Sequence, residues 1–567
     1  MFKSTAKNNL FVVVYLVSCT IVIFFITGQI YGVNDDVIIQ DWLSGFYTGK
    51  PEFMIRGSAT PKLLFGFIVS NLYDLVPQVN WFSILLLCLT LISWFLIGIL
   101  SARTKNFFVI FSFATIAFLH LIWFIPSPTY TATAVLMSFA SITYIAYTIK
   151  IQEFQKILIF IFLLYIFSYF VRPESFMLGS AIGGIFLIYS IITTIEKFKN
   201  TFRKTSIIIF FCLCIVGIDQ VYEKYFYIEN KDWAAYERWE AARYGIQANA
   251  PEKALSENPS KYGWTEAEVA LFKSYNYLDK NRFSAAKFEK LIKDTEQIQS
   301  ERDSDFLIKS HQKIFDSDIN WEWKMLISLI SLIYIVFLLL SFPKVSRYLL
   351  LTTISYGTLY VIMLYVAGFL RQPERVQVSV IFLAILISLL SFIFTSEDKS
   401  VKFLSPEAII CALLLIIITS YSIGQSRYLV NKIPKLRDSF WNVQIEYLST
   451  FPRNSIFVGN ASQFRNNWIS PYVANKFEVE KRIFTFGWHN FSPHWVSKAQ
   501  KLGLNSNNMF ESVINDPRVF WVSDKASMDY IVVYMNENGF DFKGPEKIGV
   551  MSNYGEDYIV WDFNKND

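Results

Sequence analysis

Apolar runs of about twenty residues alternate with short polar stretches along most of the 567-residue chain. An α-helix rises about 1.5 Å per residue, so a run of this length matches the roughly 30 Å hydrocarbon core of a bilayer. The pattern predicts about eleven transmembrane helices and therefore an α-helical polytopic membrane protein. The first span, at about 10–30, is too long for a cleavable signal peptide and is expected to be retained. The other spans are expected at about 81–100, 107–125, 129–149, 157–171, 176–194, 205–219, 325–342, 348–369, 376–396 and 405–422.

The basic residues between these runs predict the orientation of the chain. If the N-terminus is cytoplasmic, every cytoplasmic connection contains Lys or Arg, which is the positive-inside pattern. These residues are Arg103, Lys105, Lys150, Lys156, Lys197, Lys199, Arg203, Lys204, Lys344, Arg347, Lys399 and Lys402. We therefore expect a multi-pass protein of the cell membrane with a cytoplasmic N-terminus.

Three larger polar regions then fall on the outer side of the membrane. The first, 31–80, contains a shorter apolar stretch at 62–76 that is expected to lie at the membrane interface. The second, 220–324, is rich in charge and in helix-forming residues. The third, 423–567, resembles a small folded α/β domain. We therefore divide the chain into a transmembrane domain, 1–422, which includes both outer loops, and an extracytoplasmic C-terminal domain.

The C-terminal region alternates short β-type runs with helical stretches. Strands are expected at 455–459, 519–523, 530–534 and 558–563, and helices at about 436–450 and 495–515.

Composition agrees with a membrane protein and disfavours several functions. The chain is 53% hydrophobic and 17% charged, whereas globular domains are about a quarter charged. Its net charge of +5 lies largely in short loops between spans, so we expect no nucleic-acid partner. All five cysteines fall inside apolar runs, which leaves the polar regions without a disulfide framework or a thiolate metal site. Away from their ends the spans contain no Asp, Glu, Lys or Arg, which disfavours an ion-coupled transporter.

Ionisable residues instead collect at the predicted outer ends of the spans. The first group follows the first span and consists of Asn34, Asp35 and Asp36. One acid can open a helix expected at 37–46 as its N-cap, but this role explains two acids less well.

Two short outer turns contain arginine where the positive-inside rule does not require it. Arg172 and Glu174 lie in one turn, and Arg371, Glu374 and Arg375 lie in the other. A guanidinium group suits phosphate oxygens because it donates paired, charge-assisted hydrogen bonds. The alternative is that Arg and Glu within each turn pair with each other.

Histidines offer weaker candidates. His120, near the outer end of the third span, could carry a proton, although a packed, hydrogen-bonded role is more common for such a residue. His489 and His494 are five residues apart in a turn-like segment and make a poor metal pair without further ligands.

The scattered motifs resemble the GT-C superfamily of integral-membrane glycosyltransferases, and within it a group of bacterial GT-C-like membrane proteins. The resemblance rests on Asn34-Asp35-Asp36 with Ser44-Gly45-Phe46-Tyr47-Thr48-Gly49-Lys50-Pro51, on Arg172, on Gly263-Trp264-Thr265 with Asp279, on Arg371 to Arg375, and on Gly487-Trp488 with Ser492-Pro493. It thus extends over nearly the whole chain.

The resemblance implies sugar transfer from a polyprenyl-phosphate carrier to a glycan or glycolipid acceptor on the outer face of the membrane. An acidic residue of the first outer loop serves such enzymes as the base, which here corresponds to Asp35 or Asp36. Basic groups near the carrier phosphate correspond to Arg172, Arg371 and Arg375. Most members use no metal or other cofactor, but one oligosaccharide-transferring branch uses a divalent metal, and the sequence does not choose between them.

Physical reasoning supports the same hypothesis. Nucleotide sugars are made in the cytoplasm, so a transferase outside it needs a donor carried by a membrane lipid. A carboxylate would accept the proton of the attacking hydroxyl, and arginines would stabilise the departing phosphate. Direct displacement would invert the anomeric configuration. The alternatives are a lipid-linked-saccharide flippase or other transporter, and a non-catalytic envelope assembly protein.

Overall fold

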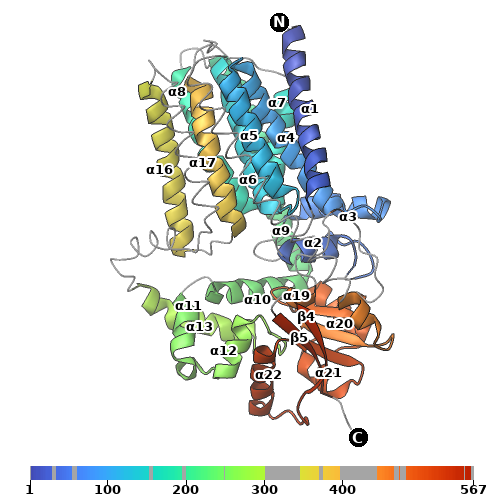
Figure 1. Ribbon diagram of the computed structural model, residues 1–567. Helices are drawn as coiled ribbons and strands as arrows, with labels where there is room; N and C mark the ends of the chain where they lie inside the picture. The colour runs from blue at the N-terminus through green and yellow to red at the C-terminus, as the bar shows by residue number, and fades with distance from the viewer. Residues whose placement is uncertain are drawn as a thin grey trace. The chain divides into compact units, whose positions relative to one another are not determined.

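A computed structural model gives the fold of the chain (Figure 1). It describes residues 2–27, 34–46, 48–53, 61–151, 157–194, 199–247, 250–300, 345–369, 374–395, 444–464, 472, 481–553 and 556–563. The chain divides into two compact units. The apolar unit comprises Met1–Gln29, Phe82–Tyr222 and Asp305–Lys432, and the polar unit comprises Ile30–Trp81, Glu223–Ser304 and Ile433–Asp567.

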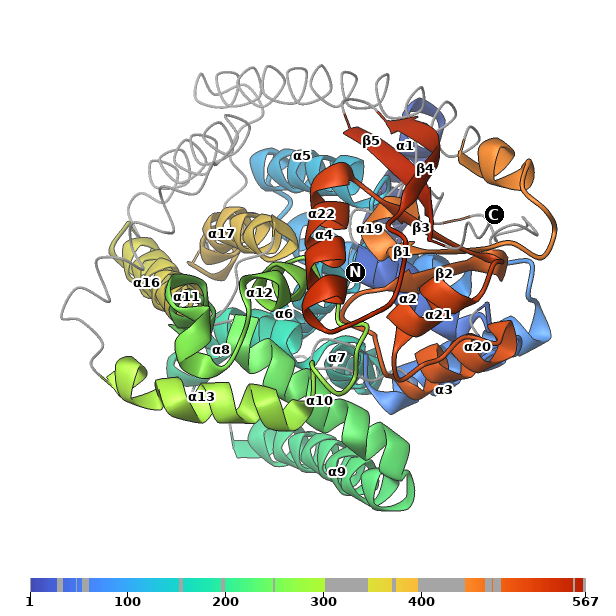
Figure 2. The same cartoon turned by 90° about the horizontal axis from the view of Figure 1, so that it is seen from below.

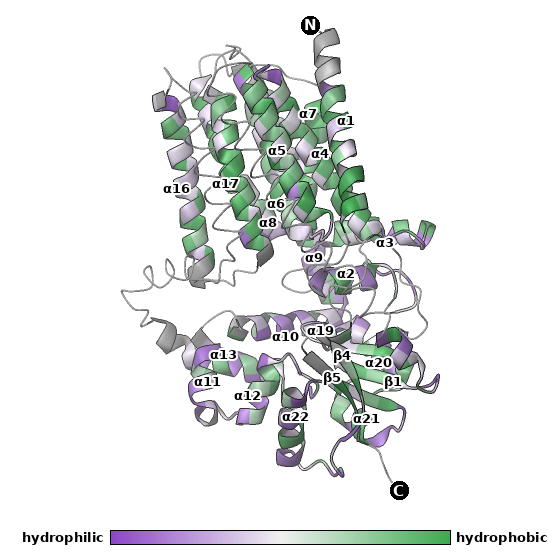
Figure 3. Cartoon of the chain, viewed as in Figure 1, coloured by the Kyte–Doolittle hydropathy of each residue, from purple (hydrophilic) through white to green (hydrophobic). Residues whose placement is uncertain are grey.

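The described part of the apolar unit is helical. Its helices are α1 (Phe2–Ile26), α4 (Trp81–Arg103), α5 (Phe107–Phe124), α6 (Tyr130–Ile151), α7 (Ile157–Val171), α8 (Pro173–Thr193), most of α9 (Lys199–Glu229), α16 (Val345–Phe369) and α17 (Glu374–Thr395). Figure 3 shows that hydrophobic residues predominate in α5, α6 and α17. Within the described ranges, seven helices are long and apolar enough to cross a membrane: α1, α4, α5, α6, α8, α16 and α17. The protein is therefore a multi-pass membrane protein.

Four of the predicted spans are not among these seven helices. The run at 157–171 forms α7, an apolar helix of 15 residues, and the run at 205–219 lies within α9. The predicted spans at 325–342 and 405–422 lie outside the described residues.

Glycines allow α6 and α8 to approach closely. A Cβ atom on Gly179 would lie 2.1 Å from the Ser138 hydroxyl oxygen, and one on Gly183 would lie 2.1 Å from a methyl carbon of Ile142. Small residues four apart let backbones touch where lipid offers no hydrophobic driving force between helices. This spacing therefore explains why α6 and α8 pack together.

The polar unit begins with two helices that follow α1 in the sequence. α2 (Asn34–Leu43) starts three residues earlier than the helix expected at 37–46, and α3 (Leu63–Leu75) matches the apolar stretch expected at 62–76. The remaining helices of the unit are α10 (Lys231–Gln247), α11 (Ala250–Glu257), the 3-10 helix η2 (Pro259–Tyr262), α12 (Glu266–Lys273), α13 (Ala285–Ser300), α19 (Ala461–Phe464), α20 (Pro493–Leu502), α21 (Met509–Asn515) and α22 (Lys525–Glu537).

A mixed five-stranded sheet forms the centre of the C-terminal region (Figure 2). Its strands are β1 (Ile456–Asn460), β2 (Ile483–Phe486), β3 (Val519–Ser523), β4 (Glu546–Asn553) and β5 (Glu556–Asp562), in the order β2-β1-β3-β5-β4. β1 pairs in parallel with β2 and β3, whereas β5 is antiparallel to β3 and β4. The side chains of β1 and β2 are almost all buried, as is usual for parallel strands covered on both faces.

The sheet confirms the prediction of a C-terminal α/β region but corrects part of its element assignment. The strand predicted at 530–534 is wrong, because these residues lie in α22. The Asp524 carboxylate accepts a hydrogen bond from the Ser527 backbone N–H as its N-cap, and buried Met528, Ile531 and Tyr534 recur at helical spacing. The helix predicted at 495–515 is two helices, α20 and α21, separated by Gly503 with φ of 77°.

Residues 274–280 join the C-terminal region through main-chain hydrogen bonds. The backbone N–H of Met509 donates to the Leu278 carbonyl, and that of Lys280 donates to the Asn507 carbonyl, both at 2.9 Å. The Asn490 side chain adds a hydrogen bond of 3.0 Å to the Tyr277 carbonyl. The loop between α12 and α13 therefore folds against the sheet region rather than apart from it.

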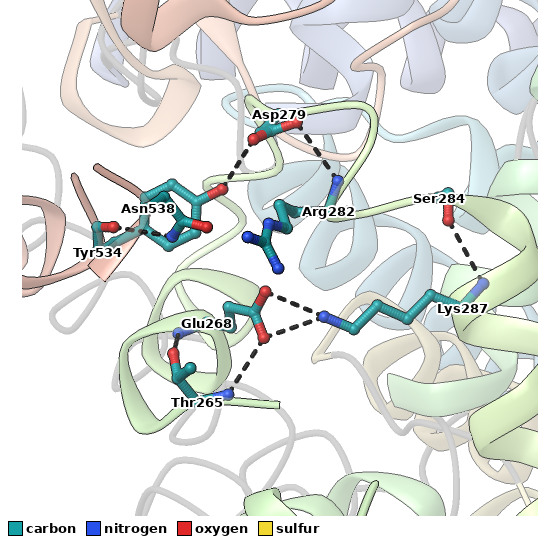
Figure 4. A network of polar contacts seen from close by, with 8 residues as sticks. All are labelled: Thr265, Glu268, Asp279, Arg282, Ser284, Lys287, Tyr534 and Asn538. Carbon is teal, nitrogen blue, oxygen red and sulfur yellow. Dashed lines mark hydrogen bonds and ion pairs between the residues drawn. The ribbon is translucent and has the colours of Figure 1, made fainter. Parts of the chain in front are cut away.

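Polar side chains link α12 to α13 and the α12–α13 loop to α22 (Figure 4). Thr265 and Glu268 form a capping box at the start of α12, and Glu268 also receives two hydrogen bonds from Lys287 on α13 at 2.9 and 3.0 Å. Asp279 accepts a hydrogen bond of 3.0 Å from the Tyr534 hydroxyl. Asp279 and Thr265, two motif residues of the sequence, thus have clear structural roles.

Candidate functional site

The acidic pair lies in the first turn of α2, and its two members differ in exposure. Asp36 is fully buried, with 0% of its surface exposed, whereas Asp35 is only partly buried. Asp36 begins a run of buried residues that continues to Leu43, whereas Asp35 lies at the partly exposed start of the helix. Of the two, Asp35 is the carboxylate that is accessible to solvent.

Buried polar side chains continue along α2. Gln40 lies one helical turn after Asp36 and is 3% exposed, and Asp41 is 1% exposed. Burying carboxylates and amides is costly unless the surroundings provide polar partners. A helix that only connects two segments does not need several buried polar side chains. We therefore regard α2 as a candidate functional element.

The turn after α2 depends on glycine. Gly45 has φ of 76°, and a Cβ atom there would lie 2.1 Å from the backbone carbon of Lys50. The backbone N–H of Phe46 donates a 2.9 Å hydrogen bond to the Asp41 carbonyl, and the backbone N–H of Gly49 donates a 2.6 Å hydrogen bond to the Gly45 carbonyl. This compact turn explains the glycines of the Ser44–Pro51 motif in conformational terms.

The C-terminal region packs directly on α2 and its turn. The Trp42 ring lies 5.5 Å from that of Trp488 and 5.0 Å from that of His494, measured between ring centroids. The ammonium group of Lys498 lies 5.4 Å from the centre of the Phe46 ring, and the Lys501 ammonium donates to the Thr48 carbonyl. Residues more than 440 positions apart therefore form one cluster within the polar unit.

His489 lies between charges of opposite sign in this cluster. Its Nε2 atom lies 3.2 Å from the Thr485 carbonyl oxygen, which can only accept, so Nε2 carries the proton and Nδ1 carries the lone pair. The pKa of His489 is lowered to about 3, chiefly by burial and also by the Lys498 charge, while the hydrogen bond with the Thr485 carbonyl and the charge of Asp35 oppose the shift. His489 is therefore a neutral imidazole within electrostatic reach of Asp35 and Lys498. The sequence offered no signal for the proximity of Asp35, which lies 454 positions earlier, whereas Lys498 follows His489 by only nine residues.

The apolar unit holds Arg172 in a buried position before α8. Its guanidinium group donates to the Thr131 hydroxyl and lies over the Tyr130 ring, 5.0 Å from the ring centre. Glu174 forms a longer ion pair with Arg172, at 3.7 Å, while its side chain remains 60% exposed. The alternative of Arg–Glu pairing is thus realised in this turn, although the Thr131 hydroxyl provides the closer contact.

A buried acid at the end of the span predicted at 205–219 was not singled out from the sequence. Asp219 is 8% exposed, and its carboxylate lies 3.4 Å from the Tyr169 hydroxyl, which also accepts a hydrogen bond from Gln220. Tyr169 precedes Arg172 by three residues, close to one helical turn, at the end of α7. The position of Asp219 at a predicted span end was the signal that could have identified it.

The other predicted site residues are less informative. His120 is buried, its Nδ1 atom accepts a 3.1 Å hydrogen bond from the Trp94 indole, and its ring packs 4.8 Å from that of Phe382. These contacts are those of a packed, hydrogen-bonded helix residue. Asn34 begins α2, and Glu374 and Arg375 begin α17, but their side chains lie outside the described set, as does all of Arg371.

Within the described ranges, no group of three or more His, Cys, Asp or Glu side chains is arranged to hold a metal ion. No known protein-family profile, curated protein or solved structure matches this chain.

Proposed function

We propose that the protein is a glycosyltransferase that moves a sugar from a polyprenyl-phosphate carrier to a glycan or glycolipid acceptor on the outer side of the membrane. The observation that carries the proposal is α2, which presents one accessible carboxylate, Asp35, beside a buried one, Asp36. A multi-pass membrane protein is also the setting in which a lipid-linked donor is available.

In the proposed reaction the acceptor hydroxyl oxygen attacks the anomeric carbon of the donor sugar. The bond from that carbon to the phosphate oxygen breaks, and the carrier leaves as polyprenyl phosphate with the bonding electrons. Asp35 accepts the proton of the hydroxyl, a role worth about 10²–10⁴ in rate for a well-placed general base. Attack opposite the leaving group inverts the anomeric configuration.

The surroundings of Asp35 suit this role. The neutral imidazole of His489 lies within electrostatic reach of Asp35. The Lys498 ammonium supplies a positive charge within electrostatic reach of the same imidazole. The resemblance to GT-C enzymes assigns Arg172, Arg371 and Arg375 to the phosphate of the leaving carrier, whose charge their guanidinium groups would stabilise.

Transfer in isolated membranes tests the proposed reaction class. Membranes with and without the protein would receive radiolabelled polyprenyl-phosphate sugars, one sugar at a time, and label would be followed from the lipid fraction into glycan. The proposal predicts protein-dependent transfer for one donor, with release of polyprenyl phosphate and an inverted linkage. Label that crosses the membrane while still attached to its carrier would favour a flippase instead. Equal glycan labelling with and without the protein for every donor would contradict the proposal.

A further inference from the structure

The helix α3 exposes large apolar side chains although it belongs to the polar unit. Leu64, Phe67 and Leu75 are 40%, 54% and 76% exposed, respectively. Their spacing places them along one side of the helix. By contrast, none of α10, α11, α12, α13, α20 and α21 exposes a large hydrophobic side chain among its described residues. The exposed side of α3 therefore differs from the water-facing sides of these helices.

The opposite side of α3 is already used for packing. Phe65, Val69 and Tyr73, which follow one another at four-residue spacing, are at most 2% exposed. The Tyr73 hydroxyl donates a 2.7 Å hydrogen bond to the buried side chain of Asn80, so this side faces protein. A helix that is apolar all round is a buried helix, either in a protein core or in a membrane. Since the exposed side of α3 is also apolar, it requires a second apolar surface.

The connection to α4 places the end of α3 at the membrane surface. α4 is one of the candidate spans, and its first residue is Trp81. The Trp81 indole N–H donates a 3.0 Å hydrogen bond to the carbonyl of Val76, the residue directly after α3. Tryptophan at the end of a span is typical of the membrane–water interface. The last turn of α3 is therefore tied to the point where α4 enters the bilayer.

The length of α3 decides how it can meet the bilayer. At 1.5 Å per residue its 13 residues reach about 20 Å, too short to cross a hydrocarbon core of about 30 Å. If α3 stood away from the surface, its exposed apolar side would face water. If it lies along the surface, the same side is buried among acyl chains. Asn71, also exposed, donates its side-chain N–H to the Phe67 carbonyl, which reduces the cost of placing this amide in lipid.

We propose that α3 is an in-plane membrane anchor whose exposed side, bearing Leu64, Phe67 and Leu75, lies among the acyl chains of the adjacent leaflet. The apolar sequence alone indicated the interface, and the structure adds which side of the helix would contact lipid. α2 packs against α3, so the anchor would hold the helix that bears Asp35 near the membrane surface. The inference concerns the lipid surface and not the reaction, so it stands or falls independently of the proposed sugar transfer.

Spin-label accessibility in a bilayer distinguishes lipid from water and from protein. The full-length protein, with its five cysteines replaced by serine, would carry one new cysteine at a time and be reconstituted into phosphatidylcholine vesicles. Leu64→Cys, Phe67→Cys and Leu75→Cys report on α3, and Val14→Cys on the span α1 gives the lipid reference. Val533→Cys is the matched control, because Val533 is also an exposed apolar helix residue but lies on α22. EPR would measure collisions of each label with oxygen and with a water-soluble nickel chelate.

The three α3 labels are expected to resemble Val14→Cys. Their oxygen-to-nickel collision ratio should exceed that of Val533→Cys by at least about threefold, because a polar chelate is costly to bring into hydrocarbon. A ratio equal to that of Val533→Cys at all three positions would show an aqueous surface and overturn the inference. Labels shielded from both reagents would show that protein covers α3, which would also overturn it. Because three positions report on one side, the test does not depend on the folding of a single variant.

Discussion

Tyr534 donates a 3.0 Å hydrogen bond to Asp279, a residue 255 positions earlier in the chain. The same carboxylate accepts hydrogen bonds from the backbone N–H groups of Asn281 and Arg282. Burial and the negative charge of Asp279 raise the pKa of the Tyr534 phenol, so the phenol remains a donor at any physiological pH. This contact links the α12–α13 loop to α22 of the C-terminal region.

Tyr534→Phe is therefore expected to destabilise the polar unit. A hydrogen bond to a charged acceptor contributes about 1.5–3 kcal/mol, and the change leaves a buried carboxylate oxygen with one partner fewer. Thermal unfolding of the detergent-solubilised protein should show a lower Tm than wild type. Tyr530→Phe is the control, because Tyr530 lies on the same helix but is 51% exposed. Equal Tm values for the two variants would show that the Asp279 contact contributes nothing.

The close contact between α6 and α8 leads to a second prediction, which concerns stability. Gly179→Ala would place a Cβ atom 2.4 Å from the backbone oxygen of Val135, which cannot move aside as a side chain can. Overpacking of this kind costs about 1–3 kcal/mol, so Tm should fall. Gly184→Ala on the same helix should be neutral or slightly stabilising, because no described atom lies within 4 Å of its Cβ position. A neutral Gly179→Ala would contradict the close approach of the two helices.

Glu223 should make stability depend on pH near neutrality. Burial raises its pKa from 4.5 to about 7, and the charge of Glu237 adds to the shift. The Lys62 ammonium, 2.8 and 3.0 Å from its carboxylate oxygens, favours the ionised form and opposes this shift, but burial has the larger effect. Because the folded pKa exceeds the unfolded one, this group's contribution to stability is fully present below about pH 4.5 and is lost as pH rises through 7.

Glu223→Gln should therefore flatten the dependence of Tm on pH between 4.5 and 7. The control is Glu229→Gln, an exposed position near the end of the same helix, which should leave the wild-type profile intact. If the wild-type Tm does not fall over this interval, or if both variants flatten it equally, Glu223 is not the responsible group.

Much of the fold could be predicted from sequence, because bilayer thickness imposes a length on apolar helices. The seven candidate spans of the described chain all coincide with predicted apolar runs. The strands at 456–460 and 519–523 were also predictable, since parallel strands buried on both faces give short continuous apolar runs. A strand was predicted at Tyr530–Tyr534 because the β-branched residues Ile531, Val532 and Val533 favour strands locally. The Asp524 cap and tertiary burial instead favour the helix that is present there.

The site could be predicted only in part. Asp35 and Asp36 stood out because paired acids follow a span directly, but which of them is accessible depends on the direction of a helix that begins at Asn34. His489 and Lys498 could not be assigned to the same cluster from local pattern, since tertiary folding alone brings them to α2. The arginine turns were recognisable as exceptions to the positive-inside rule, and Arg172 is indeed buried, with a hydroxyl partner in Thr131.

The central claim is that Asp35 is the base of a sugar transfer, and one comparison tests it most directly. Initial rates of transfer from the active polyprenyl-phosphate sugar would be measured for wild type, Asp35→Asn and Asp36→Asn, each purified and matched for folded protein by Tm. We expect Asp35→Asn to lose at least about 10²-fold in rate while keeping its Tm, because asparagine cannot accept the proton. We expect Asp36→Asn to act mainly through stability, because Asp36 is fully buried. Wild-type rates in a folded Asp35→Asn variant would contradict the account.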